Sequence, residues 1–186
     1  KIEFNGQGVD ISKYTKSSPA RYNIYASRGG EIVINNGIFK FNSTNNTRRS
    51  YVCVENGGKV IINGGTFSNG NFGDDALATY ARGLIFADSN GKVTVNGGTF
   101  NALKSIFDFQ NNLGTTSPVI TVKGGNYSAD PAKVTSYGSI VLDANCVVVE
   151  NNGVWNVVKA AAKIGEKAYA TLEDAFKAAT SGCTID

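Results

Sequence analysis

Apolar residues recur at every second position in five similar segments of the chain. The segments are GGEIVINNGIF (29–39), GGKVIINGGTF (57–67), NGKVTVNGGTF (90–100), SPVITVKGGNY (117–127) and NCVVVENNGVW (145–155). Successive side chains of a strand point to opposite faces, so this spacing predicts short β-strands that are buried on one face. The buried face carries β-branched residues: Ile32/Ile34, Val60/Ile62, Val93/Val95, Ile120/Val122 and Val147/Val149. The other face carries Glu31/Asn35, Lys59/Asn63, Lys92/Asn96, Lys123 and Glu150.

Each alternating segment is part of a longer repeat unit. A Gly or Asn pair supplies a sharp corner, and an aromatic residue then begins a second short strand. A further apolar strand precedes each segment, over 21–27, 50–56, 83–89, 105–111 and 138–144. The closing aromatic residues recur 28, 33, 27 and 28 residues apart, at Phe39, Phe67, Phe100, Tyr127 and Trp155.

This near-constant period predicts an all-β fold in which the repeat units stack. A unit of three short strands cannot bury its apolar face alone, but stacked units pair equivalent strands in parallel and form a β-solenoid of about five coils. Residues 21–159 would form this solenoid, with the five closing aromatic residues as a ladder in its core. An antiparallel β-sandwich is the alternative fold, and it does not explain the fixed period.

The two ends of the chain differ from the repeat. Residues 1–20 are expected to form an entry or cap segment. Residues 160–186 read as a linker and a helix, with Thr171 as N-cap and Gly182 as the stop signal. This helix would either cap the solenoid or begin a further module, and the residues after it favour the second interpretation. We also expect the chain to be a fragment of a longer protein.

Composition narrows the chemistry that is available. A net charge of +3, spread along the chain, argues against a nucleic-acid surface, and no apolar run is long enough to insert into a membrane. Without His there is no Ser–His or Cys–His pair and no His-ligated zinc. Cys53, Cys146 and Cys183 lack metal-ligand spacing and are expected to be free thiols. We therefore expect no metal and no cofactor.

Without His, any catalysis would depend on carboxylates, Lys, Arg or Tyr, and the carboxylates are the candidates for polysaccharide chemistry. Asp74 and Asp75 lie in a long loop near Arg82, and Asp88 and Asp108 lie late in equivalent strands, where they could stack on one another. The alternatives are a solvated loop tip or helix N-cap for the first pair and outward-facing polar positions for the second. No catalytic residue is assigned on this basis.

Binding is predicted on the loop side of the solenoid. The loops 42–50, 68–82 and 128–137 vary in length and are expected to leave from one corner, which is often the binding side of a solenoid. The candidate binding residues are Arg48, Arg49, Phe72, Asp74, Asp75, Tyr80, Arg82 and Tyr137. The alternative is that these loops vary because nothing constrains them.

A second candidate surface is a stripe for association with other subunits. Tyr25, Cys53, Phe86 and Phe107 fall at or near one position of the upstream strands. If the flanking aliphatic residues point inward, this set forms an exposed apolar stripe. The alternative is that these strands face the interior in both registers.

The repeats resemble a known family. GGKVIINGGTF, GKVTVNGGTF, KGGNYSADPAKV and VENNGVWNVV are similar to the NGGTF-type repeats of pectate-lyase-like right-handed parallel β-helix proteins, which include gut bacterial surface proteins and phage virion fibres. The resemblance covers roughly residues 28–186 and implies the right-handed sense of the coils. The closing AAKIGEKAYATLEDAFKAATSGCTI resembles the element that introduces a further repeat block in such chains. No catalytic motif of the family matches residue by residue.

The resemblance implies a structural role outside the cell. We expect a non-catalytic, adhesive segment of a fibre or appendage on a phage virion or a bacterial surface, and the lack of any sign of wall anchoring slightly favours the virion. Its partners would be other fibre subunits, with a homotrimer as one arrangement, and a glycan or protein receptor. The alternative function is a polysaccharide lyase or hydrolase of the tailspike-like depolymerase kind.

Overall fold

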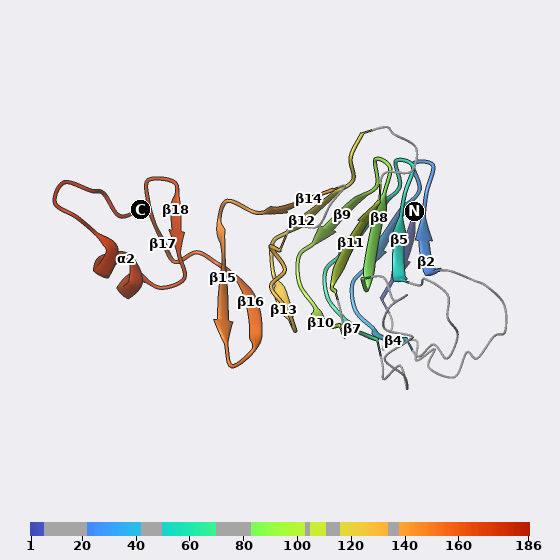
Figure 1. Ribbon diagram of the computed structural model, residues 1–186, viewed down its shortest axis with the longest axis horizontal. Coiled ribbons are helices and arrows are strands. Elements are labelled where there is room, and N and C mark those ends of the chain that lie inside the picture. The colour runs from blue at the N-terminus through green and yellow to red at the C-terminus, as the bar shows by residue number, and fades with distance from the viewer. Residues whose placement is uncertain (6–21, 42–49, 70–82, 103–104, 111–115, 134–137) are drawn as a thin grey trace.

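The computed structural model describes residues 1–5, 22–41, 50–69, 83–102, 105–110, 116–133 and 138–186. These residues form an all-β structure built mainly from parallel sheets, with one short helix near the C-terminus (Figure 1). The parallel sheets fit the predicted solenoid architecture, because each takes one strand from each successive repeat unit.

Sheet A contains the strands of the first four alternating segments, together with β1 and β14. Its strands run parallel in the order β1 (Ile2–Phe4), β3 (Glu31–Ile34), β6 (Lys59–Ile62), β9 (Lys92–Val95), β12 (Val119–Val122) and β14 (Ser139–Leu142). β1 pairs with β3, so the segment expected to be an entry or cap contributes a strand to this sheet.

Two further sheets complete the repeat. Sheet B holds the upstream strands β2 (Tyr22–Ala26), β5 (Ser50–Val54), β8 (Ile85–Asp88) and β11 (Phe107–Gln110), all parallel. Sheet C holds β4 (Ile38–Phe41), β7 (Thr66–Asn69), β10 (Thr99–Asn101) and β13 (Gly125–Tyr127) in parallel. β16 (Val154–Lys159) and β15 (Cys146–Asn151) follow in sheet C as antiparallel strands.

The core consists of columns of like residues from successive strands. In sheet A, Ile32, Val60, Val93 and Ile120 pair in register and are buried, as the alternation predicted. In sheet C, Phe39, Phe67, Phe100 and Tyr127 form a buried stack with successive ring centroids 4.7, 5.0 and 5.0 Å apart. The Tyr127 hydroxyl donates a hydrogen bond to the Gly124 carbonyl at 2.7 Å, which allows a polar group in this ladder.

The corners require glycine where neighbouring repeat units come close. Gly98 has φ +115°, and a Cβ built there would lie 3.0 Å from the carbonyl oxygen of Gly65. At Gly58, a Cβ would lie 2.3 Å from the carbonyl oxygen of Ala26. The repeated glycines therefore allow one unit to stack closely on the next.

An asparagine ladder runs along the corner after sheet A. The Nδ2 group of Asn35 donates to Asn5 Oδ1, that of Asn63 to Asn35 Oδ1 at 2.6 Å, and that of Asn96 to Asn63 Oδ1 at 2.7 Å. Lys123 follows on the next strand, and its Nζ lies 3.5 Å from an Asp143 carboxylate oxygen. After β12 and β14, the last two strands of sheet A, an ion pair therefore replaces the hydrogen bonds between asparagine side chains.

The prediction that the fifth segment forms another coil is wrong. Residues 138–144 were expected beside β11 in sheet B, but β14 pairs with β12 in sheet A. β15 and β16 then form an antiparallel hairpin, in which Trp155 lies opposite Tyr127 and is only partly buried. The turn residues Asn152 and Gly153 have φ of 52° and 78°, which suits a two-residue hairpin loop.

The C-terminal residues form a small module beyond this hairpin. β17 (Ala162–Ile164) and β18 (Lys167–Tyr169) pair antiparallel, and the helix α2 (Leu172–Ala178) packs against both. Thr171 caps the helix as predicted, because its Oγ1 accepts from the Asp174 backbone N–H at 3.1 Å. The C-cap is Ala179, so the helix ends before Gly182.

Candidate functional site

The predicted loop-side binding residues lie outside the described residues. They are Arg48, Arg49, Phe72, Asp74, Asp75, Tyr80, Arg82 and Tyr137. Two of the segments that carry these residues nevertheless begin directly after described strands. Phe41 and Asn69 are register partners at the ends of β4 and β7, so loops 42–49 and 70–82 begin at the same edge of sheet C.

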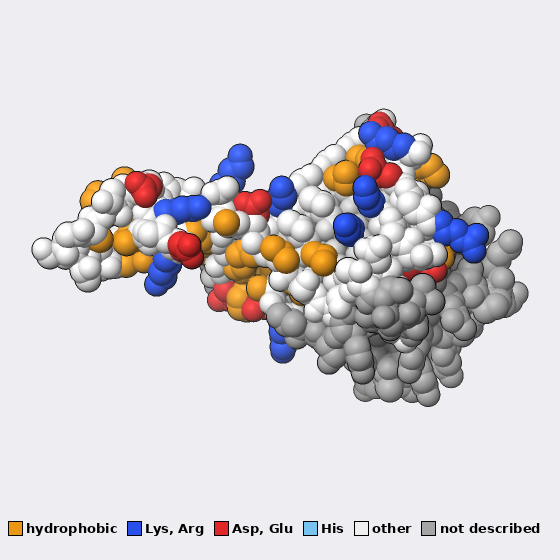
Figure 2. Space-filling view, turned by 90° about the horizontal axis from the view of Figure 1, so that it is seen from above, with side chains coloured by type: hydrophobic (Ala, Val, Ile, Leu, Met, Phe, Trp, Pro, Cys, Tyr) orange, Lys and Arg blue, Asp and Glu red, His pale blue; other side chains and the backbone are white. Residues whose placement is uncertain are grey.

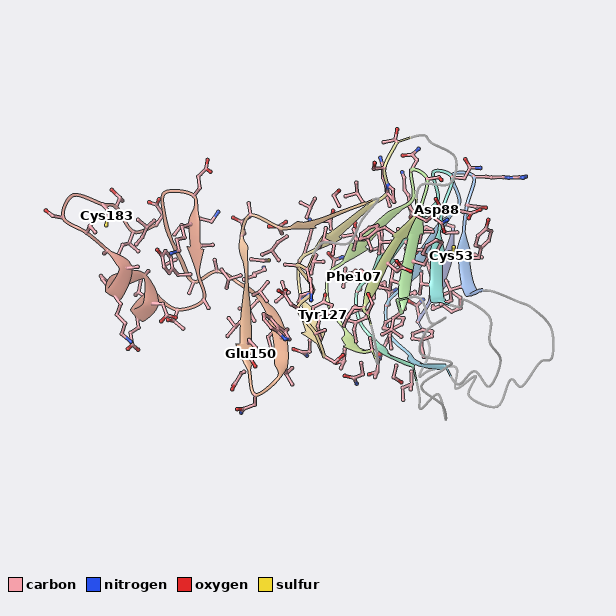
Figure 3. All side chains as sticks on the ribbon, in the orientation of Figure 1. Cys53, Asp88, Phe107, Tyr127, Glu150 and Cys183 are labelled. Carbon is pink, nitrogen blue, oxygen red and sulfur yellow. The ribbon has the colours of Figure 1, made fainter. Side chains whose placement is uncertain are left out.

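The predicted association stripe is corrected by the register of sheet B. Tyr25, Cys53 and Phe86 pair with one another on successive strands, but the next residue in this column is Asp108. Phe107 pairs with Ile85 in the inward column instead, and its ring centroid is 6.0 Å from that of Tyr127 in the interior (Figure 3).

The exposed fractions of these side chains show that they do not form a continuous surface. Tyr25 is 47% exposed, whereas Cys53, Phe86 and Phe107 are 0%, 1% and 3% exposed. Cys53 and Phe86 point away from the core columns yet are buried, which agrees with the alternative that these strands are covered on both faces. An apolar residue on the outer face of a strand is therefore not by itself evidence of a free surface.

The carboxylates of sheet B do not stack as expected. Asp88 lies opposite Gln110, and Asp108 lies opposite Phe86, so the two acids are diagonal neighbours on adjacent strands. Asp88 is 4% exposed and accepts a hydrogen bond from the Ser89 hydroxyl at 2.6 Å. Asp108 accepts from the Phe109 backbone N–H at 2.9 Å. Both acids thus have identifiable structural roles as hydrogen-bond acceptors.

Tyr25 and Glu55 form a side-chain pair that the sequence analysis missed. The Tyr25 hydroxyl donates to Glu55 Oε1 on the next repeat unit. This hydrogen bond, together with burial, raises the pKa of Tyr25 above its ordinary value, so the hydroxyl remains a donor at neutral pH. Tyr25 and Glu55 are 30 residues apart, which is close to the repeat period. This spacing is the feature of the sequence that could have predicted the pair.

A polar cluster joins the last strand of sheet A to the C-terminal module. Asp143 Oδ1 accepts from the Asn145 backbone N–H at 3.0 Å, and this bond, with the charge of Lys123, lowers the pKa of Asp143. The Lys163 Nζ donates to Asn145 Oδ1 at 2.8 Å. Asn145 therefore links the Asp143 turn to β17 through its side chain.

The part of the chain that the structure describes contains no cluster of metal ligands and no helix of membrane-spanning length. No group of three or more Cys, Asp or Glu residues there is arranged to hold a metal ion. Within the same residues, the only helix found is far too short to cross a membrane. None of the three cysteines forms a disulfide. Burial raises the pKa of Cys146, and the charge of Asp143 adds to this.

Comparison with known proteins gives no relative. No protein-family model matches the chain, and neither the curated proteins nor the solved structures provide a match.

Proposed function

We propose that the chain is a right-handed parallel β-helix segment with a structural and adhesive role in a fibre or appendage, displayed on a phage virion or a bacterial surface. The observation that carries this proposal is the in-register pairing of equivalent strands from successive repeat units in three parallel sheets. The right-handed sense and the virion or cell-surface setting are supported by the resemblance of the repeats to NGGTF-type proteins.

The stacking supports a mechanical role. Backbone hydrogen bonds of all three sheets run from one repeat unit to the next, and side-chain columns reinforce them along the same direction. Such a structure is quasi-one-dimensional, and its stability is approximately a sum of units and their interfaces. It would keep its shape as a spacer that holds attached loops away from a surface.

The loops that begin at the edge of sheet C are the proposed contact for a glycan or protein receptor. Residues 42–49 and 70–82 directly follow the ends of β4 and β7, which are register partners. They carry Arg48, Arg49, Phe72, Tyr80 and Arg82, which combine cationic and aromatic side chains suited to sugar rings and acidic groups.

A binding experiment with loop variants tests the proposal. The immobilised chain is exposed to a panel of bacterial surface polysaccharides and cell-surface glycoproteins, and association is followed by biolayer interferometry. Combined Arg48→Ala and Arg49→Ala substitutions, and separately Tyr80→Ala, should weaken binding about tenfold or more, the usual scale for a contact residue at the centre of an interface. Arg28→Ala, at an exposed corner between sheets B and A, is the matched control.

The outcomes separate the parts of the proposal. Binding that survives every loop variant would move the receptor site away from the loops. Release of shorter oligosaccharides from a bound polysaccharide would refute the non-catalytic role and support the depolymerase alternative. Absence of binding across the panel would count against an adhesive role and leave only the spacer.

A further inference from the structure

Eight asparagines of the chain are followed directly by glycine. Asn-Gly is a chemically labile pair, because glycine has no Cβ to hinder attack of its backbone nitrogen on the preceding side chain. The structure describes both residues of six pairs, which begin at Asn36, Asn56, Asn63, Asn90, Asn96 and Asn152. Five of them lie at corners of the stacked units, in the broad part of the molecule, and the last lies in the hairpin turn, towards the narrower C-terminal module (Figures 1 and 2).

The reaction of such a pair begins with ring closure. The glycine nitrogen forms a bond to the side-chain carbon Cγ of the asparagine, the Cγ–Nδ2 bond breaks, and ammonia leaves with the proton that the nitrogen gives up. Water then opens the resulting succinimide at one of its two carbonyl groups and leaves aspartate or isoaspartate. The reaction needs water and no oxidant or cofactor. Its rate depends on how readily the nitrogen reaches Cγ.

In the Asn36-Gly37 pair, the two reacting groups are already in contact. The Gly37 N–H donates to Oδ1 of Asn36 at 2.8 Å, so the nitrogen lies next to the carbonyl group that it would attack. Asn36 is exposed, so water can reach this side chain. The pair is therefore held near the geometry that ring closure requires.

Packing fixes the glycine of this pair in its position. Gly37 has φ +149°, and a Cβ built on it would lie 2.6 Å from a ring carbon of Phe39. The carbonyl oxygen of Gly37 accepts from the Thr66 N–H of the next unit at 2.8 Å. Gly37 is therefore held between its neighbours, and the exposed Asn36 side chain is the part that moves when the ring closes.

The peptide groups of two other corner pairs are held by bonds to different residues. The Asn56 carbonyl accepts from the Arg28 N–H at 3.0 Å, which fixes the peptide group that follows Asn56. At the next corner, the Gly91 N–H donates to the Asp88 carbonyl at 2.8 Å. Ring closure at either pair must first break the bond that holds its peptide group.

The remaining pairs are restrained at the side chain or by a carboxylate. In the asparagine ladder, Nδ2 of Asn63 donates to Asn35 at 2.6 Å, and Nδ2 of Asn96 donates to Asn63 at 2.7 Å. In the hairpin turn, the Gly153 N–H donates to Oε1 of Glu150 at 2.6 Å, and Figure 3 shows Glu150 near this turn. All five of the other described pairs thus have a hydrogen bond that opposes ring closure.

We propose that Asn36-Gly37 is a site of self-modification, at which Asn36 converts into aspartate or isoaspartate faster than the asparagine of any other described pair. Isoaspartate adds one atom to the backbone between β3 and β4, which are paired in register with β6 and β7. The corner cannot absorb this extra atom unless one of these strands shifts. The product therefore loosens the unit that contains Phe39, at one end of the aromatic ladder.

Peptide mass spectrometry of the intact chain, aged at physiological temperature and mildly alkaline pH, tests the proposal. The mass gain that accompanies replacement of an amide by a carboxyl group is followed at each Asn-Gly pair, after digestion in acid to stop the reaction. Asn36 should convert about fivefold or more faster than the other described pairs, because each of those must first give up a hydrogen bond. The same chain unfolded in urea is the reference, in which all pairs should convert at similar rates.

The variant Asn36→Gln is the matched control, because a glutamine side chain would have to close a larger ring. After ageing, hydrogen exchange of the β3 and β4 amides should be faster than in a fresh sample for the native chain, and unchanged for Asn36→Gln. The proposal is overturned if another described pair converts as fast as Asn36 in the folded chain, or if Asn36 stays intact while the unfolded chain converts. Equal exchange in aged and fresh native chain would refute the effect on the corner. None of these results depends on receptor binding, so failure here leaves the loop-side proposal standing.

Discussion

Replacement of Phe67 by alanine tests whether the aromatic ladder is the main stabilising column of the fold. Phe67 is fully buried, and its ring stacks between those of Phe39 and Phe100 at centroid distances of 4.7 and 5.0 Å. The substitution removes a large apolar side chain and leaves a cavity between two rings that are held by their own strands. A buried Phe→Ala change costs about 3–5 kcal/mol, which includes the lost transfer free energy and the cavity.

The expected result for Phe67→Ala is a loss of about 4 kcal/mol in the free energy of unfolding. For a chain of this length, that corresponds to a fall in the unfolding temperature of about 8–16 °C. Urea and thermal unfolding followed by far-UV circular dichroism measure both quantities. Phe176→Ala is the matched control, because this ring is 63% exposed and its loss should change the free energy by no more than about 0.5 kcal/mol.

A double-mutant cycle shows whether the stacked rings couple. Phe67 and Phe100 are neighbours in the ladder, so their coupling energy should be about 0.5–1.5 kcal/mol. Phe39 and Phe100 are separated by Phe67, which stacks on both, so their coupling energy should be smaller than that of the neighbouring pair. The reasoning is refuted if Phe67→Ala costs less than 1 kcal/mol, or if the separated pair couples as strongly as the neighbours.

Three further predictions concern the corner, the charges and the thiols. Gly98→Ala should destabilise the fold by about 1–3 kcal/mol, because a Cβ is strained at φ +115° and contacts the preceding unit; an unchanged urea midpoint would contradict this. The pKa of Asp143 is lowered chiefly by the Asn145 N–H, so its contribution to stability should be complete above about pH 4 and disappear as the pH falls through the lowered pKa. Unfolding of Asp143→Asn, compared with the native chain as a function of pH, measures this, and an equal difference at pH 2 and pH 7 would contradict it. Native-state labelling with a maleimide should modify Cys183 first and the fully buried Cys53 last, which mass spectrometry of peptides can follow; faster labelling of Cys53 would show that its strand opens readily.

Several features of the fold followed from the sequence alone. The period and the alternation identified the strands of the first four repeat units, the buried β-branched columns and the aromatic ladder through Tyr127. The N-cap at Thr171 was also predicted from its residue type and position. These features depend on local geometry, since a period of two defines the faces of a strand and a repeated length brings equivalent faces together.

The alternation of apolar residues does not specify the direction or the neighbour of each strand. These were determined by the pairing of strands in the tertiary structure. The segment 145–155 carries the same pattern as the other four, yet it forms an antiparallel hairpin because two residues, Asn152 and Gly153, both adopt positive φ. The Asn-Gly pair alone does not specify a hairpin, because segment 29–39 carries the same pair at Asn36-Gly37 and yet its strands β3 and β4 lie in different sheets. Likewise, a one-residue shift in 105–111 places Phe107 in the core and Asp108 on the outer face.

Burial on the outer face of sheet B was decided only by the assembled chain. Phe86 and Tyr25 occupy the same column, yet one is buried and the other is nearly half exposed. The sequence of a strand specifies which side chains share a face, but not which other part of the molecule covers that face. For the same reason, the sequence could identify the residues that form the stacked repeat units, whereas only the structure shows which surfaces are exposed.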